Sequence, residues 1–149
     1  MASKLKTVKS TKKVTTPIKL RSITVPEVGE YWPGQGGIFA GMMRGRDGTK
    51  SYALILGPML PESNFDAATK KAAKAKVDGH KDFRPPYRNE QSLLFANLKD
   101  HFKSRWYWSC ERRAVDEDYA WCQWFDDGFQ DYGDVSGTGL GCAVRVVKI

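Results

Sequence analysis

The pattern of apolar positions predicts a β-hairpin in the first half of the chain. Residues 38–43 and 50–56 are two mainly apolar runs, and the segment between them contains Asp47 and Gly48. An Asp-Gly pair favours a tight hairpin turn, because glycine adopts a positive φ without strain and aspartate tolerates it. We therefore expect two antiparallel strands here.

Two helices are expected after this hairpin. The first begins near Ser63, the expected N-cap, and carries an alanine face and a lysine face until Gly79 ends it. The lysine face is interpreted as a solvated surface. The second helix covers residues 88–98, where Leu94 and Leu98 fall on one apolar stripe.

Residues 106–132 carry an unusual amount of aromatic surface. Alternation along residues 119–125 predicts a strand whose side chains divide between two faces. Asp127 and Gly128 then supply a hairpin turn, and residues 129–132 form the returning strand. Two interpretations remain open: the ribbon is a core element buried on both sides, or its second face meets a partner. The aromatic residues expected in the core are Tyr107, Trp108, Trp121 and Phe125.

The order of these elements predicts an α+β fold. A Gly-rich loop at residues 133–141 leads to a last strand at residues 142–147, which we expect beside the first strand. Two helices segregated from antiparallel strands are typical of α+β domains. The length of 149 residues and the hydrophobic content of 41% suit one globular domain.

Charge divides the chain into a basic arm, residues 1–22, and a neutral domain, residues 23–149. The net charge is +7, and seven cations with no acidic residue lie in the arm, so the other 17 basic residues match the 17 acidic ones. Such an arm could be a solubilising tail, dock on a partner protein or bind nucleic acid. Its cations are Lys4, Lys6, Lys9, Lys12, Lys13, Lys19 and Arg21.

The sequence predicts no membrane insertion and no signal peptide. No apolar run approaches the ~20 residues that span a bilayer, and no apolar segment follows the N-terminal lysines. We therefore expect the protein to be made in a cytoplasm.

Metal, cofactor and enzyme chemistry are not expected. Three cysteines and two histidines, His80 and His101, lack the spacing of a zinc site, and the acidic turns match no calcium-loop motif. Neither histidine has a nearby residue in the sequence that would orient it for catalysis. Free thiols are the default in a reducing compartment, and a Cys110–Cys122 or Cys110–Cys142 bridge is expected only outside the cell.

A binding surface is the preferred interpretation of the aromatic ribbon. Aromatic rings supply contact area at small entropic cost, while arginines and carboxylates orient a ligand. The candidate ligand-binding residues are Trp124, Phe129, Tyr132, Asp131, Arg112 and Arg113.

Several motifs resemble a known family. The run Asp82-Phe-Arg-Pro-Pro-Tyr-Arg-Asn-Glu90 resembles "D-W-R-L-P-T-R-x-E-L", and Tyr107-Trp-Ser-Cys-Glu111 resembles "Y-W-S-S-x-E". Ala120 to Gly128 is similar to the hairpin "A-W-x-x-x-F-x-x-G", and Val144 to Val147 to a terminal "V-R-x-V". These are motifs of the C-terminal domains of collagen-like adhesins, modules found in bacterial surface proteins and phage genomes. Tyr87 departs from the pattern, because it stands where a helix-capping threonine is expected.

The resemblance covers residues 27–149 and implies a C-type-lectin-like domain with two helices, antiparallel strands and long irregular loops. It implies a non-enzymatic phage or prophage virion component, which binds a host-surface glycan or protein or decorates the particle. The arm would anchor it to other virion proteins, in several copies or as a homo-oligomer. The alternative is an intracellular phage-encoded protein whose arm binds nucleic acid and whose domain binds a host protein. A third possibility is an enzyme related to the formylglycine-generating enzymes, which would use the cysteines.

Overall fold

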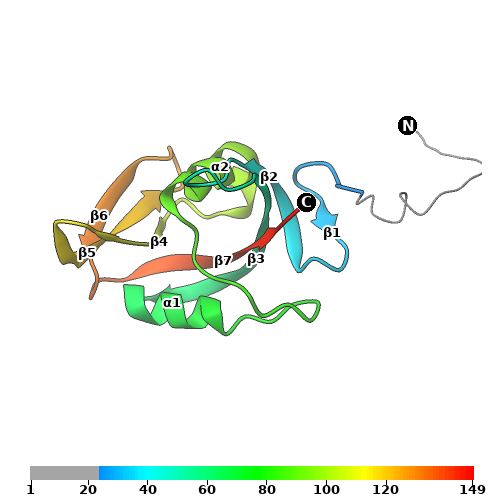
Figure 1. Ribbon diagram of the computed structural model, residues 1–149. Coiled ribbons are helices and arrows are strands. Elements are labelled where there is room, and N and C mark those ends of the chain that lie inside the picture. The colour runs from blue at the N-terminus through cyan, green and yellow to red at the C-terminus, as the bar shows by residue number, and fades with distance from the viewer. Residues whose placement is uncertain (1–23) are drawn as a thin grey trace, which may run out of the picture.

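The structure, a computed structural model, describes residues 24–149 (Figure 1). The basic arm predicted at residues 1–22 therefore lies outside the described residues. In chain order the elements are β1 (Tyr31–Trp32), β2 (Gly37–Met43), β3 (Tyr52–Ser63), α1 (Phe65–Ala73), α2 (Arg88–Leu98), a 3₁₀ turn (Lys99–His101), β4 (Trp106–Arg113), β5 (Asp116–Trp124), β6 (Gln130–Asp134) and β7 (Gly139–Val147).

One seven-stranded mixed sheet dominates the domain, in the order β1-β2-β3-β7-β4-β5-β6. Neighbouring strands are antiparallel except β4 and β7, which run parallel and pair at Tyr107 and Leu140. The strand β7 thus lies at the centre and joins two antiparallel groups, β1-β2-β3 and β4-β5-β6 (Figure 1).

The predicted α+β, C-type-lectin-like fold is wrong. A continuous mixed sheet replaces the expected arrangement of two helices, antiparallel strands and long irregular loops. Segments expected to be loops or helix extend as strands: β3 continues for 12 residues to Ser63, and the Gly-rich segment contains the end of β6 and the beginning of β7. Glycine and proline in these segments disfavour strands, so the sequence did not predict strands there. Pairing with the neighbouring strands outweighed these local preferences.

The predicted β2–β3 hairpin is confirmed, with Ile38 opposite Leu56 and Met43 opposite Tyr52. Gly37 is required where the strands approach closely, because a Cβ there would lie 2.1 Å from the carbonyl oxygen of Leu56. The last strand, β7, pairs with β3 and β4, so its predicted place beside β2 is wrong.

The helix α2 begins and ends as predicted, but α1 is shorter than expected. Ser63 is still paired in the sheet with Gly139, so the N-cap is Asn64, whose Oδ1 accepts the N–H of Ala67. The helix ends at Ala73, well before Gly79.

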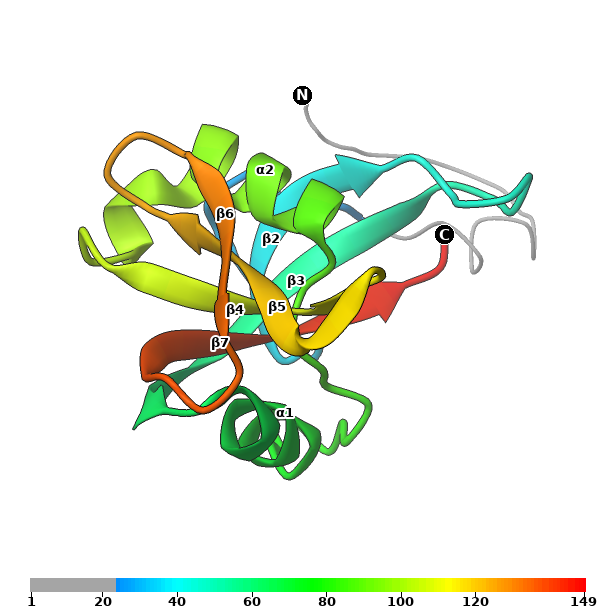
Figure 2. The same cartoon turned by 90° about the vertical axis from the view of Figure 1, so that its left-hand side faces the viewer.

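The helices cover opposite faces of the sheet (Figure 2). Since side chains alternate along a strand, Leu54 and Leu56 pack with Leu94 of α2, whereas Ala53 and Ile55 point to the other face. On the α1 face, Phe65 and Ala68 pack on Trp108 and β5. The central strands are therefore buried on both faces.

Candidate functional site

The strands β4, β5 and β6 form a ribbon with two chemically different faces. Opposite pairs place Cys122 beside Asp131 on one face and Trp121 beside Tyr132 on the other. We call the first the pocket face, formed by Trp106, Trp108, Cys122, Trp124, Phe129 and Asp131. We call the second the arginine face, formed by Arg88, Arg113, Tyr119, Trp121 and Tyr132.

A cavity of about 290 Å³ opens on the pocket face. Gly139 lies in its wall, where a Cβ would lie 3.1 Å from the Trp108 indole nitrogen, so β7 approaches this indole closely because the residue is glycine. Its lining residues are Trp106, Trp108, Cys122, Asp131, Tyr132, Gly133, Asp134, Gly137, Thr138 and Gly139.

Both indoles of the cavity are held in place. The Nε1–H of Trp108 donates to the Ser63 carbonyl oxygen at 3.0 Å, and Phe65 meets the indole edge-to-face with centroids 5.6 Å apart. The Trp106 ring packs on Trp124 at 5.4 Å and on Phe129 at 6.4 Å. Because 58% of Phe129 is exposed, an aromatic strip continues from the cavity to the surface.

The polar side of the cavity is acidic. Asp134 accepts the hydroxyl and the N–H of Ser136, and these bonds hold its pKa below the usual value. Asp131 accepts the N–H of Tyr132. Within residues 24–149, no lysine or arginine lines the cavity, and residues 116–138 contain seven acidic residues and no basic one.

The arginine face is a ladder of stacked rings and guanidinium groups. The Arg88 guanidinium lies 3.5 Å from the Trp121 ring centre, and the Arg113 guanidinium lies 3.9 Å from that of Tyr132. Trp121 and Tyr132 are packed edge-to-face at 5.4 Å, and Tyr119 contacts Tyr132 in the same way. Such stacking orders both the cation and the ring.

The six predicted ligand-binding residues are thus divided between two faces. Trp124, Phe129 and Asp131 share the pocket face. Arg113 and the ring of Tyr132 lie on the arginine face, although Tyr132 also contributes to the edge of the cavity. Arg112 contacts neither group; it pairs with Asp66 at 2.8 Å.

Eight of the ten cavity residues were not among the sequence candidates. They are Trp106, Trp108, Cys122, Gly133, Asp134, Gly137, Thr138 and Gly139. The alternation of Trp106 and Trp108 on one strand face, together with the nearby Gly133, Gly137 and Gly139, was the available signal. It could be used only once the β-ribbon and the Gly-rich segment were known to meet.

The core assignments are largely confirmed. Tyr107, Trp108 and Phe125 are buried, whereas Trp121 is half-buried beneath Arg88. Phe125 stacks on Phe102 with centroids 4.0 Å apart and meets Tyr107 at 5.0 Å.

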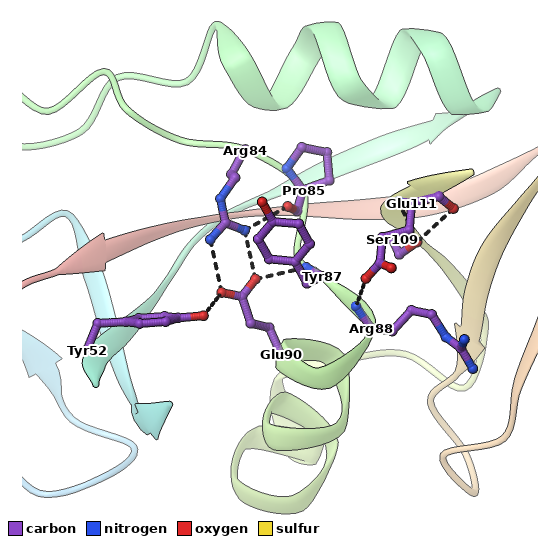
Figure 3. A network of polar contacts seen from close by, with 8 residues as sticks. All are labelled: Tyr52, Arg84, Pro85, Tyr87, Arg88, Glu90, Ser109 and Glu111. Atoms are coloured by element: carbon purple, nitrogen blue, oxygen red, sulfur yellow. Dashed lines mark hydrogen bonds and ion pairs between the residues drawn. The ribbon is translucent and has the colours of Figure 1, made fainter. Parts of the chain in front are cut away.

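A buried carboxylate fixes the start of α2 beside the sheet (Figure 3). Glu90 is fully buried and accepts two bonds from Arg84, at 2.7 and 2.9 Å. It also accepts the hydroxyl of Tyr52 and the N–H of Tyr87. A capping box normally has two bonds, one from each side chain. The Tyr87 side chain makes no capping bond, so only the bond from the Tyr87 N–H to the Glu90 carboxylate is present.

These contacts shift the pKa values of Tyr52 and Arg84. Burial and the bond to Glu90 raise the pKa of Tyr52. Burial disfavours the charged form of Arg84, but the Glu90 carboxylate outweighs it, so the pKa of the guanidinium is raised. Both groups therefore keep their protons throughout the neutral range.

The three cysteines are free thiols with suppressed acidity. Burial raises the pKa of Cys110 to about 11 and those of Cys122 and Cys142 to about 12. Because the thiolate is the reactive form, these environments do not favour nucleophilic or oxidative cysteine chemistry at neutral pH. Within residues 24–149, no three His, Cys, Asp or Glu side chains gather as a metal site.

The buried thiols predict a loss of stability in alkali. The ordinary thiol pKa is 9.0, so the contribution of the buried thiols to folding is complete below pH 9 and is lost as the pH rises towards the folded value of about 12. Urea unfolding of the wild type and of Cys142→Ala, measured between pH 9 and 10, should show a slope shallower by about 1 kcal/mol per pH unit in the variant. Parallel pH profiles would contradict this assignment.

No protein-family model matches the chain. A comparison with curated proteins likewise found no similar sequence. Among the described residues, no helix has the length and apolar character needed to cross a membrane.

Proposed function

We propose that the chain is a non-enzymatic component of a phage or prophage particle whose domain binds a host-surface glycan through the pocket face. The observation that carries the binding role is the cavity that combines two fixed indoles with an acidic rim. Binding sites for small molecules typically combine an apolar lining with a few polar groups that orient the ligand.

The two kinds of group match the two kinds of surface on a sugar. The C–H face of a pyranose can pack on the electron-rich face of Trp106, which is partly exposed, while Trp108 is buried behind the cavity wall. Asp131 provides a carboxylate acceptor for hydroxyl groups, and charge-assisted bonds of this kind are the stronger ones. Because no lysine or arginine of the described part of the chain lines the cavity, the preferred glycans are neutral or carry an amino group.

The particle role is supported by the separate basic arm and by the sequence motifs shared with the adhesin family, although the fold that this family implies is not the one observed. The arm contains Val8, Val14, Ile18 and Leu20 among its cations. Apolar residues add nothing to an electrostatic contact with a phosphate backbone, so this composition favours docking on a virion protein over binding to nucleic acid.

Glycan-array screening of the full chain, followed by calorimetry, tests the pocket. Trp106→Ala should weaken binding of the selected glycan by about tenfold or more, because it removes one aromatic platform. Asp131→Asn should weaken it by about tenfold, because a charge-assisted hydrogen bond becomes a neutral one.

The controls are Tyr119→Ala, an aromatic truncation on the arginine face, and Asp100→Asn, an exposed carboxylate in the 3₁₀ turn. Melting temperatures of all four variants establish that they fold. If the two pocket variants bind like the controls, the pocket is not the site. If no glycan binds the wild type, the carbohydrate role is wrong.

Sedimentation tests the particle role separately. The full chain should co-sediment with particles from an induced lysate, and a chain lacking residues 1–21 should remain in the supernatant. If neither chain sediments, the virion role is wrong, and binding of the arm to nucleic acid should be measured across a salt series. In that case log affinity should fall steeply and linearly with log salt.

A further inference from the structure

Three arginines beside the start of α2 and on the ribbon have an unusual environment. Arg84, Arg105, Arg112 and Arg145 are paired with carboxylates. Within residues 24–149, no carboxylate lies within ion-pairing distance of Arg46, Arg88 or Arg113, and each lies on an aromatic ring instead. Those rings belong to Tyr87, Trp121 and Tyr132, at 4.2, 3.5 and 3.9 Å from ring centre to guanidinium carbon.

Stacking fixes a guanidinium without using its hydrogen-bond donors. The contact with the ring occupies the flat face, while the N–H groups project from the edge and remain able to bind an anion. The side chain of Arg88 is fixed further, because its Nε–H donates to Gln130 Oε1 at 3.0 Å, and the amide of Gln130 donates to Gln123. No contact within the described residues uses the terminal nitrogens of Arg88.

Two of these arginines line one hollow. Arg46 and Arg88 border an open volume of about 370 Å³ together with Asn89, Ser92, Glu111 and Gln130. The hollow contains two guanidinium groups and one carboxylate, and an oxygen of that carboxylate is already bonded to the backbone N–H of Arg88 at 2.8 Å (Figure 3). The first turn of α2 also borders the hollow, and the positive end of its dipole adds to the attraction for anions.

The third arginine extends the cationic surface along the ribbon. Arg113 lies on the Tyr132 ring, which packs edge-to-face against Trp121, the ring on which Arg88 lies. Two separate cationic positions on one face suit a chain with repeated anionic groups better than one small anion. Guanidinium groups match the geometry of phosphate oxygens, to which they can donate two parallel bonds.

We propose that the arginine face, together with Arg46 beside it, is a second binding site. It takes successive phosphate groups of a polymer that has no bases. Nucleic acid is disfavoured, because binding to a single strand relies on bases that stack on aromatic faces. Here Arg88 and Arg113 occupy faces of Trp121 and Tyr132 on which a base would stack. The site lies on the opposite side of the ribbon from the cavity, so it does not depend on the proposed glycan role.

The test is NMR titration of the full chain with inorganic polyphosphate, followed by calorimetry. Signals of the Nε–H groups of Arg46, Arg88 and Arg113 and of the Trp121 indole N–H should shift. Arg88→Gln and Arg113→Gln should each lower affinity by about tenfold, the effect of losing a charge-assisted hydrogen bond. Arg46→Gln should also lower the affinity for polyphosphate. Arg46 is an exposed residue of the β2–β3 turn and is not bonded to the ribbon.

The matched controls are Lys70→Gln and Lys74→Gln, which remove the same charge from exposed positions at α1, on the other side of the sheet (Figure 2). They should leave affinity unchanged. The proposal is overturned if they weaken binding as much as the arginine variants, or if only signals of residues 1–23 shift. It is also overturned if orthophosphate binds as tightly as the polymer, or if oligothymidylate binds more tightly than polyphosphate.

Discussion

Replacing Phe125 with alanine is expected to lower the free energy of unfolding by about 4 kcal/mol, as truncation of a buried aromatic residue typically does. Phe125 is 1% exposed and lies among three rings, stacked on Phe102 and edge-on to Tyr107 and Phe95. The ring joins α2, the 3₁₀ turn and β4, so neighbouring elements cannot close the space without moving the helix. Urea denaturation followed by circular dichroism measures the change.

Phe129→Ala is the matched control for this prediction. It removes the same ring four residues later, but Phe129 is 58% exposed. Its effect on the free energy of unfolding should stay within about 0.5 kcal/mol, as is usual for surface positions. Equal losses for the two variants would contradict the placement of Phe125 in the core.

The second large effect is expected from Glu90→Gln, which should cost about 3 kcal/mol. Removing one member of a buried ion pair commonly costs ~3–5 kcal/mol, because its partner is left without compensation. The lower end applies here, since the Arg84 side chain is 30% exposed and can recover some hydration. Amide substitution also turns one acceptor into a donor that faces either the Tyr52 hydroxyl or the Arg84 guanidinium.

Glu62→Gln provides the comparison for Glu90. Glu62 pairs with Arg105 at 2.6 Å, but both side chains are nearly half exposed, at 49% and 45%. Surface pairs of this kind contribute little, so a change below about 1 kcal/mol is expected. If Glu90→Gln were as mild as Glu62→Gln, the network at the start of α2 would not be a major source of stability.

Local signals in the sequence were sufficient for the elements that depend on local chemistry. The turn at Asp47 and Gly48 set the β2–β3 hairpin, and the stripe of Leu94 and Leu98 set α2. Both elements owe their form to contacts within a few residues along the chain. The same holds for the β5–β6 turn, where Gly128 adopts a φ of 84°.

The fold class was missed where strands lack an alternating side-chain pattern. Gly139 and Gly141 begin a strand that is buried on both sides, so glycine there reflects close packing on Trp108 and Leu60 rather than a loop. Pro58 and Pro61 lie in β3, near register shifts that remove the need for regular pairing. These outcomes depend on partners distant in the sequence.

The sequence named candidate residues on the ribbon, but it did not predict that they lie on two different faces. Alternation alone assigns Trp121 and Trp124 to different faces of β5, yet it does not say which residues of β4, β6 and α2 meet each face. The contact of Arg88 with Trp121 and that of Trp108 with Gly139 each join residues more than thirty positions apart in the sequence. Such contacts require the tertiary fold.

The central position of β7 has a consequence for how the domain folds. The hairpin β2–β3 and the ribbon β4–β5–β6 can each form from nearby segments, but β7 is the last strand in sequence and the one that joins them. Closing the sheet therefore waits for pairings of high sequence separation, between residues 53–63 and 139–147. Because long-range pairing slows folding, the two halves should collapse early, and the final insertion of β7 should limit the rate.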